Sequence, residues 1–381
     1  MAKQGLPTLF ALLAVAAFTP ATAAQQQVPS IPFDATEPLK LPTDVYFGEV
    51  AGVALNSKRH VFVYTRTNTQ GASITEGQRA QLFEFGPDGE FVKEIGRGLY
   101  SMAWAHSVRI DKQDNIWLVD NGSDEIVELG ADYRKKMVLG RREESVGARN
   151  PRPPVAPGTP VRPARPGYFN EPTDVAWDLQ GNIFISDGYR NTNVHKFDKD
   201  GNNVKLVGGP GGEPLQFKTP HGIAVDKKGM VYVADRGNGR IQVLDNNLNF
   251  VREIKYQTSM PKDYVSPLPD FGGDGRGGSQ TQADANSPVW SLWPNTICIT
   301  PGDNGEEQYI YTHDMFPGYL QKFSLDGKLL GEVRAGAGRK VGQVGWIHAL
   351  ACVSENEVWV GELLNWRVQK FVLHPDRAAK R

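Results

Sequence analysis

Three histidines are placed to bind one metal ion. His106, His221 and His348 each stand at the start of a similar unit: an apolar run, a polar turn, a second apolar run and a polar corner. They are three of the seven histidines in the chain. Three neutral imidazoles leave a fourth position open on Zn²⁺, as catalytic zinc sites do. The alternative is three hydrogen-bonded histidines without a metal; their shared repeat position favours the metal site.

The polar corner after the second apolar run supplies further candidates. Arg66 and Arg236 stand there in the first and fourth units, and Tyr189 stands one residue later in the third. A guanidinium binds a carboxylate through two parallel hydrogen bonds, so the arginines indicate a small acid or a chain terminus as ligand. A phenol beside zinc can act as a base. The structural alternative is two solvated arginines and a packed tyrosine.

Other polar residues of the repeats are expected to be structural. Asp120, Asp187 and Asp235 stand at this corner, where a carboxylate typically accepts hydrogen bonds from the N–H groups of a turn. Four histidines lie outside the repeat register and are expected at the surface or in packing: His60, His195, His313 and His374.

The unit that carries these residues occurs six times. It is clearest at 219–245, TPHGIAVDKKGMVYVADRGNGRIQVLD, where three short runs joined by turn residues indicate an antiparallel meander. The units begin at Ala51, His106, Thr173, His221, Asn295 and His348. A fourth strand fits the segments Phe91–Ile95, Asn203–Val207, Phe250–Ile254 and Leu329–Val333.

Six repeats of four short strands predict an all-β fold, a six-bladed β-propeller. A solenoid is the alternative, but no repeat is polar enough to cap one. The first strand of each blade lines the central channel, so histidines in alternate blades should converge there at one depth. Asp44–Glu49 is expected to supply the strand that completes the last blade.

The segments outside the repeats are predicted to be a signal peptide, a linker, a tail and surface loops. Residues 1–24 combine Lys3, an apolar core and a small-residue cleavage site, which predicts a signal peptide and a secreted or periplasmic protein. The alternative, a membrane anchor, needs a run of roughly 20 apolar residues, which is longer than this core. We expect a linker at 25–43, the propeller at 44–375, a tail at 376–381, and surface loops inserted at 141–167 and 257–291.

Charge and cysteine content exclude some classes of protein. The net charge is −1 over 381 residues, which gives no overall attraction to nucleic acid or to an anionic membrane. Two cysteines, Cys298 and Cys352, are too few for a disulfide scaffold. They stand on inner strands of neighbouring blades, where either a bridge or two buried thiols is compatible with the sequence. We expect a monomer with no membrane span after removal of the signal peptide.

Several of these segments resemble a known family. Residues 169–197 (FNEPTDVAWDLQGNIFISDGYRNTNVHKF), 217–243 (FKTPHGIAVDKKGMVYVADRGNGRIQV) and the units at His106 and His348 are similar to NHL repeats. More narrowly, they resemble the peptidyl-α-hydroxyglycine α-amidating lyase, the second catalytic domain of peptide-amidating enzymes. The resemblance covers nearly the whole chain after residue 24. It implies a six-bladed propeller whose central zinc is held by the three histidines.

The resemblance also implies roles and a reaction. Tyr189 falls on the family's catalytic tyrosine, and Arg66 and Arg236 fall on its two substrate-binding arginines. The implied enzyme cleaves the N–C bond of a peptidyl-α-hydroxyglycine to give a peptide amide and glyoxylate. Two other functions stay open: another metal-dependent lyase or hydrolase that acts on a different small molecule, and a propeller that binds a ligand without catalysis.

Two departures from the family pattern bear on the site. In the family, an aspartate follows the last zinc-binding histidine and binds a structural calcium; here the residue is Ala349, so the calcium is not carried over. Trp346 stands where the family has methionine, which changes the wall of the pocket.

Overall fold

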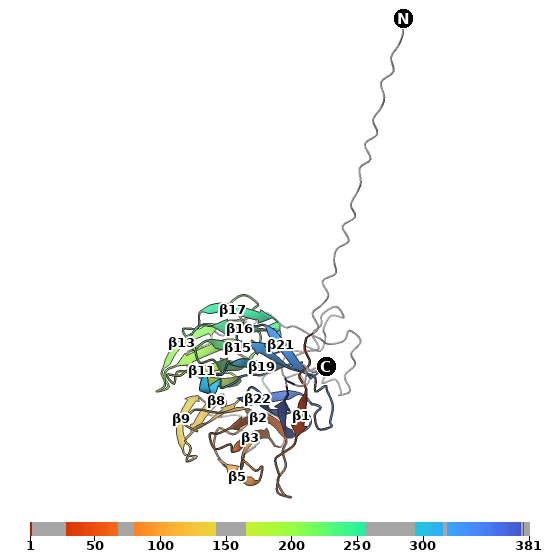
Figure 1. The fold of residues 1–381 in the computed structure, drawn as a ribbon. Coiled ribbons are helices and arrows are strands. Elements are labelled where there is room, and N and C mark those ends of the chain that lie inside the picture. Colours follow the sequence, from red (N-terminus) through yellow and green to blue (C-terminus); the bar gives the residue numbers. More distant parts are fainter. Residues whose placement is uncertain are drawn as a thin grey trace.

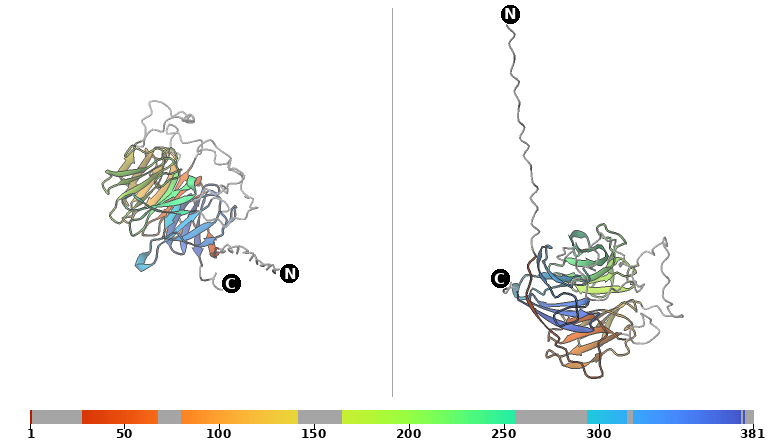
Figure 2. Two further views of the ribbon diagram at one scale, coloured as in Figure 1. Left: turned by 90° about the horizontal axis from the view of Figure 1, so that it is seen from above. Right: turned by 90° about the vertical axis from the view of Figure 1, so that its right-hand side faces the viewer.

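Six antiparallel sheets of four strands make up the described part of the chain. The computed structural model describes residues 28–67, 80–141, 165–255, 294–314 and 318–374, with the single residues 1 and 376. Nearly all of the predicted signal peptide and of the two predicted insertions lies outside these residues. Figure 1 shows the sheets grouped around a common centre, and Figure 2 shows them from two further directions. The predicted six-bladed propeller is confirmed.

The first three blades follow the predicted repeats. Blade 1 contains β2 (Glu49–Leu55), β3 (Val61–Arg66), β4 (Ala80–Phe85) and β5 (Phe91–Ile95). Blade 2 contains β6 (Ala105–Ile110), β7 (Ile116–Asp120), β8 (Glu125–Leu129) and β9 (Lys135–Gly140). Blade 3 contains β10 (Pro172–Trp177), β11 (Ile183–Asp187), β12 (Asn193–Phe197) and β13 (Asn203–Gly208).

The last three blades complete the ring. Blade 4 contains β14 (Pro220–Val225), β15 (Val231–Asp235), β16 (Arg240–Leu244) and β17 (Phe250–Lys255). Blade 5 contains β18 (Ile297–Ile299), β19 (Tyr309–His313), β20 (Leu320–Ser324) and β21 (Leu329–Val333). Blade 6 contains β22 (Ile347–Ser354), β23 (Glu357–Glu362), β24 (Arg367–Leu373) and β1 (Phe33–Thr36). Two 3₁₀ turns are present, η1 (Arg236–Asn238) and η2 (Asp303–Gly305), and no helix in the described ranges is long and apolar enough to cross a membrane.

The strand that completes blade 6 is not the predicted one. β1 pairs antiparallel with β24, and the Phe33 ring lies 4.9 Å from the Phe371 ring, centroid to centroid. The prediction that Asp44–Glu49 fills this place was wrong, and the propeller begins inside the segment expected to be a linker. Phe47, in the predicted strand, instead packs 5.9 Å from Phe83 of blade 1. The outer edge of blade 6 therefore pairs with the first strand of the chain, which closes the ring.

The hydrophobic core lies between neighbouring blades. One cluster joins Phe62 and Leu82 of blade 1 to Leu118 of blade 2. Another joins Trp359 of blade 6 to Val63 of blade 1, so the last blade packs against the first. Four further clusters fill the remaining junctions between successive blades. This closure contradicts the solenoid alternative and holds the inner strands rigidly around the channel.

The two cysteines form a disulfide. Cys298 in β18 and Cys352 in β22 are joined across the junction of blades 5 and 6, with their Cα atoms 5.8 Å apart. The structure therefore selects the bridge over the two buried thiols.

Candidate metal centre

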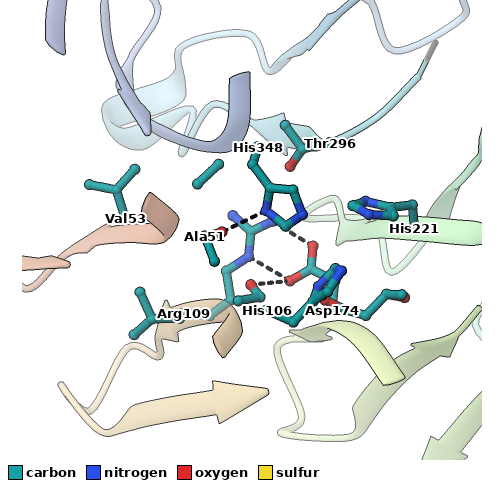
Figure 3. Close-up of a pocket in the computed structure, with 12 residues that line it drawn as sticks. Ala51, Val53, His106, Arg109, Asp174, His221, Thr296 and His348 are labelled. Carbon is teal, nitrogen blue, oxygen red and sulfur yellow. Dashed lines mark hydrogen bonds and ion pairs between the residues drawn. The ribbon is translucent and has the colours of Figure 1, made fainter. Parts of the chain in front are cut away.

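Three imidazoles converge at the centre of the propeller. His106, His221 and His348 lie on the inner strands β6, β14 and β22 of alternate blades and are buried. Each offers one ring nitrogen, and these nitrogens all lie within 4.8 Å of one another. Figure 3 shows the three rings facing one cavity. The structure brings together the three histidines that the repeat position predicted.

A β-bulge positions each of these side chains. The pairing register of β6 shifts between Ala105 and Ser107, and that of β22 shifts between Ile347 and Ala349. His106 and His348 are thus the extra residues of their strands, and His221 lies within the corresponding shift of β14. A bulge breaks the alternation of the strand and re-aims a side chain. Because the repeats share the bulge, the side chains enter the channel at the same depth.

Backbone carbonyls of the neighbouring blades orient the rings. The Nδ1 atom of His106 lies 2.6 Å from the Thr173 carbonyl oxygen, and that of His348 lies 2.8 Å from the Ala51 carbonyl oxygen. His221 has a hydrogen bond with the backbone of Asn295. These three acceptors begin the units that lack histidine. A carbonyl only accepts, so Nδ1 carries the proton and the Nε2 lone pairs are left for a metal.

The environment keeps the three imidazoles neutral. Burial lowers the pKa of each histidine well below its usual value; the positive charge of Arg236 lowers all three further, and that of Arg66 lowers those of His106 and His348. The Nε2 atom of His348 is buried and has no hydrogen-bond partner among the described residues. Such an atom costs free energy unless something binds it. Three neutral nitrogen donors, one of them without any hydrogen-bond partner in the described residues, fit a metal that prefers imidazole, such as Zn²⁺.

Tyr189 lies directly beside the three histidines. Its hydroxyl oxygen is 3.0 Å from Nε2 of His221 and 3.4 Å from Nε2 of His106. The preceding Gly188 permits this position, because a Cβ there would lie 1.8 Å from the Pro220 carbonyl oxygen. Blade 3 thus has one more residue, Gly188, between the corner aspartate and Tyr189 than blade 4 has before Arg236. Only glycine fits at this position, and it lets the tyrosine reach the channel.

Arg66 approaches the site from blade 1. This buried side chain donates from Nε to the Ala105 carbonyl oxygen at 2.7 Å and from Nη1 to Glu49 Oε2 at 3.0 Å. Its guanidinium carbon lies 4.8 Å from the centroid of the Trp104 ring, a cation–π contact. The side chain is therefore held in place before any ligand binds.

Arg236 approaches from the opposite blade. It begins η1, donates from Nη1 to the side-chain oxygen of Asn295 at 3.1 Å, and lies 5.3 Å from the centroid of the Tyr189 ring. Within the described ranges, Arg66 is paired with a carboxylate and Arg236 is not. The structure places all six predicted site residues around one point, and Arg236 carries the less neutralised charge.

The corner aspartates are structural, as predicted. Asp235 accepts hydrogen bonds from the backbone N–H of Lys218 at 2.7 Å and from Arg240 Nε at 2.9 Å. Asp120 accepts bonds from the backbone N–H groups of Ala103, Trp104 and Ser123. Burial raises the pKa of Asp120 to about 6, so these bonds offset a cost of desolvation.

Sequence reasoning missed a buried ion pair beside the histidines. Arg109 in β6 donates to both carboxylate oxygens of Asp174 in β10, at 2.9 and 2.5 Å. Both residues line the cavity that the three histidines share (Figure 3). The available signal was a charged residue within an otherwise largely apolar inner strand, in HSVRI and in TDVAW. Their pairing depends on the registers of two blades, which the repeat alignment did not compare.

The chain is similar to several known proteins. Residues 217–244 match the family model of the NHL repeat. The chain is 30% identical over 269 residues to the peptidylglycine alpha-amidating monooxygenase of Rattus norvegicus, covering 64% of this chain and 26% of that protein. It is 27% identical over 218 residues to a probable peptidyl-alpha-hydroxyglycine alpha-amidating lyase of Caenorhabditis elegans, covering 53% of this chain and 57% of that protein.

The chain is a six-bladed propeller with a match to the NHL repeat, and it is similar in sequence to proteins named as amidating lyases. It spans only about a quarter of the amidating monooxygenases that it matches. Among solved structures, a gluconolactonase from Xanthomonas campestris superposes with a TM-score of 0.53 at 14% identity, covering 94% of this chain and 99% of that one. A streptogramin B lyase superposes with a TM-score of 0.51 at 13% identity, covering 90% and 98%. At these identities the two structures support the fold alone.

Proposed function

We propose that this NHL-repeat propeller is a zinc-dependent lyase that cleaves the N–C bond of peptidyl-α-hydroxyglycine-like substrates. The products are an amide and glyoxylate. One observation carries the proposal: the Tyr189 hydroxyl lies within 3.4 Å of two Nε2 atoms of a histidine tripod, between two arginines. This arrangement occurs on a chain related to proteins named as amidating lyases.

The metal would be held by His106, His221 and His348. Burial keeps all three neutral, and the Nδ1 atoms of His106 and His348 already bond to backbone carbonyls, so the tripod can bind zinc without first losing a proton. When bound, zinc supplies a Lewis acid that polarises oxygen atoms of the substrate.

The arginines would bind the substrate carboxylate. Arg236 has a neutral amide partner among the described residues, so a carboxylate can displace or share that contact at small electrostatic cost. Arg66 stays paired with Glu49 and adds positive charge from the opposite side. A carboxylate held between the two would set the α-carbon beside the Tyr189 hydroxyl.

Tyr189 would transfer the proton. In its phenolate form the Tyr189 oxygen accepts the proton of the α-hydroxyl, and the electrons of that O–H bond form the C=O bond of glyoxylate. The C–N bond breaks, its electrons pass to the amide nitrogen, and that nitrogen takes up a proton to complete the peptide amide. The tyrosine can return the proton it accepted, so the reaction needs no other co-reactant.

An exported protein fits this proposal. The Cys298–Cys352 disulfide is stable in an oxidising compartment and uncommon in the reducing cytosol. The first 24 residues have the composition of a signal peptide.

A second candidate is another metal-dependent lyase or hydrolase that acts on a different small molecule. Trp346 favours it. This residue stands two positions before His348 with a backbone φ of +56°, and its carbonyl accepts a hydrogen bond from Leu363 N–H at 3.0 Å. The amidating-lyase family that the chain resembles has methionine at this position, and an indole so close in sequence to His348 would change which substrates the site admits.

Substitution of the tripod tests the proposal. His221→Ala should lose both zinc and glyoxylate release from an acyl-α-hydroxyglycine. His60→Ala is the matched control, because His60 bonds to Glu84 outside the channel, and this variant should keep both. A His221→Ala protein that retains zinc and activity would overturn the proposal. Zinc-loaded wild type that is inactive on every acyl-α-hydroxyglycine, but active on another small molecule, would select the second candidate.

A further inference from the structure

The calcium implied by the family resemblance does not fit this cavity. The residue after His348 is Ala349, whose methyl group lines the cavity and offers no oxygen ligand. Three oxygen-bearing groups in this region already accept hydrogen bonds from Arg109. They are the Asp174 carboxylate, the Leu350 carbonyl at 3.0 Å and the Ile297 carbonyl at 3.3 Å. The Arg109 guanidinium, a positive charge of the chain itself, therefore takes the place that a calcium ion would occupy beside these oxygen atoms.

The Arg109 guanidinium crosses the channel. It starts from β6 in blade 2 and reaches Asp174 in blade 3, Ile297 in blade 5 and Leu350 in blade 6. The other end of the network is Asp174, which also accepts a bond from the Ile223 N–H of blade 4 at 3.2 Å. One ion pair thus connects the inner strands of five blades.

The chemistry of these partners suits a positive charge. A carboxylate and two carbonyls form an all-oxygen set of the kind that hard cations such as Ca²⁺ prefer. The Asp174 side chain is only 4% exposed, and a buried carboxylate without a partner is strongly unfavourable. The planar guanidinium offers five donors in a fixed fork, enough to satisfy the carboxylate and both carbonyls together.

The network also reaches the tripod. Arg109 lies three residues after His106 on β6, and Ser107 between them donates from Oγ to Asp174 Oδ1 at 2.8 Å. Asp174 in turn directly follows Thr173, whose carbonyl orients the His106 ring. The ion pair therefore fixes β6 against β10 at the point where the His106–Thr173 hydrogen bond forms.

We propose that Arg109 is a positioning residue that acts as a built-in cation beneath the histidine tripod, so that the site keeps its geometry without calcium. The tripod part of this inference rests on the proposed metal site. The calcium part does not, because it concerns only Arg109 and the oxygen atoms around it.

The test compares thermal unfolding and zinc affinity in Arg109→Ala and wild type, with and without millimolar CaCl₂. We expect the wild type to be indifferent to calcium. Arg109→Ala should unfold roughly 5–10 °C lower and bind zinc roughly tenfold more weakly, because it leaves a buried carboxylate unpaired beside a metal ligand. Calcium, and not magnesium, should restore at least half of both losses, since the freed oxygens accept the larger ion.

Arg367→Ala is the matched control. Arg367 is also largely buried, and it bonds to Glu362 and to three backbone carbonyls at the rim of blade 6. This variant should lose stability but keep its zinc affinity, and calcium should not rescue it. The double variant Arg109→Ala/Ala349→Asp adds a carboxylate and should respond to lower calcium concentrations than Arg109→Ala.

Three outcomes would overturn the proposal. They are a wild type stabilised by calcium, an Arg109→Ala variant with unchanged unfolding and zinc affinity, and losses in that variant that calcium does not reverse. Should Arg109→Ala fail to fold in either buffer, Arg109→Lys decides. The retained charge should keep it folded and indifferent to calcium, and stabilisation of Arg109→Lys by calcium contradicts the proposal. None of these readouts is lyase activity, so the result stands apart from the proposed reaction.

Discussion

The hydroxyl oxygen of Tyr189 lies 3.0 Å from Nε2 of His221, the nitrogen that would bind the metal. The proposed proton acceptor and the metal site are therefore adjacent before any substrate arrives. Gly188 makes the contact possible, because no other residue fits against the Pro220 carbonyl. The geometry separates two roles that substitution can test independently: binding of the metal and transfer of the proton.

Tyr189→Phe should keep zinc and lose activity. The ring still packs beside His221, but the group that accepts the proton is gone, which typically costs 10²–10⁴-fold in rate. Glyoxylate release should fall by roughly this factor at saturating substrate, with bound zinc near the wild-type level. Tyr168→Phe is the control, since Tyr168 is an exposed tyrosine. Full activity in Tyr189→Phe would remove the tyrosine from the mechanism.

Arg236→Gln should weaken substrate binding. The glutamine keeps polarity but not charge, and loss of a charge-assisted bond to a carboxylate costs about 1.5–3 kcal/mol, or roughly 10- to 150-fold in affinity. Steady-state kinetics should show the change mainly in KM. Arg190→Gln alters the arginine that follows Tyr189 at the corner of blade 3, where its side chain pairs with Glu171, and should leave KM unchanged. Equal effects of the two substitutions would contradict a carboxylate contact at Arg236.

The metal-free protein should lose stability in acid. Burial lowers the pKa of His313 to about 4, and burial also lowers those of the three tripod histidines. The unfolded chain takes up protons near pH 6.5, before the folded protein does, so folding stability is complete above pH 6.5 and falls as the pH drops toward 4. Urea unfolding measured between pH 6.5 and pH 4 should show the free energy of unfolding decreasing as the pH falls. His313→Gln should flatten part of it, and an unchanged slope would contradict burial of a neutral His313.

The disulfide should contribute substantially to stability. Cys298 and Cys352 are 54 residues apart, and closing a loop of this size stabilises a protein by about 4 kcal/mol in the chain-entropy model. The Cys298→Ser/Cys352→Ser protein should unfold at lower denaturant concentration by a corresponding amount. Reductant should lower the stability of the wild type and leave the double variant unaffected. Identical unfolding of reduced and oxidised wild type would show that the disulfide does not contribute to the free energy of unfolding.

The repeat made much of this structure predictable. Once the six units were aligned, His106, His221 and His348 fell on one position, and the corner that follows supplied Arg66, Arg236 and Tyr189. Channel position depends on repeat register alone, because each blade presents its inner strand in the same way. The sequence could not show the β-bulges that aim the histidines. Because each bulge lies at the same repeat position, the three histidines still converge on the channel as predicted.

Relations between blades were harder to predict. β1 pairs with β24, more than 330 residues away, and its four residues carry only a weak strand signal. The Asp44–Glu49 segment looked closer to the repeat, but its Phe47 packs within blade 1 instead. The Arg109–Asp174 pair was missed for a similar reason: the pair and its hydrogen-bond partners together span five blades, and no single repeat contains the pattern.

In the proposed reaction, one zinc ion on this tripod enables lyase chemistry at Tyr189. The most direct measurement is a titration of zinc into chelator-stripped, purified protein, with glyoxylate release from an acyl-α-hydroxyglycine followed at each addition. We predict that the rate rises from near zero in proportion to added zinc and levels off at one zinc per chain. Protein that binds one zinc per chain and releases no glyoxylate would contradict the claim.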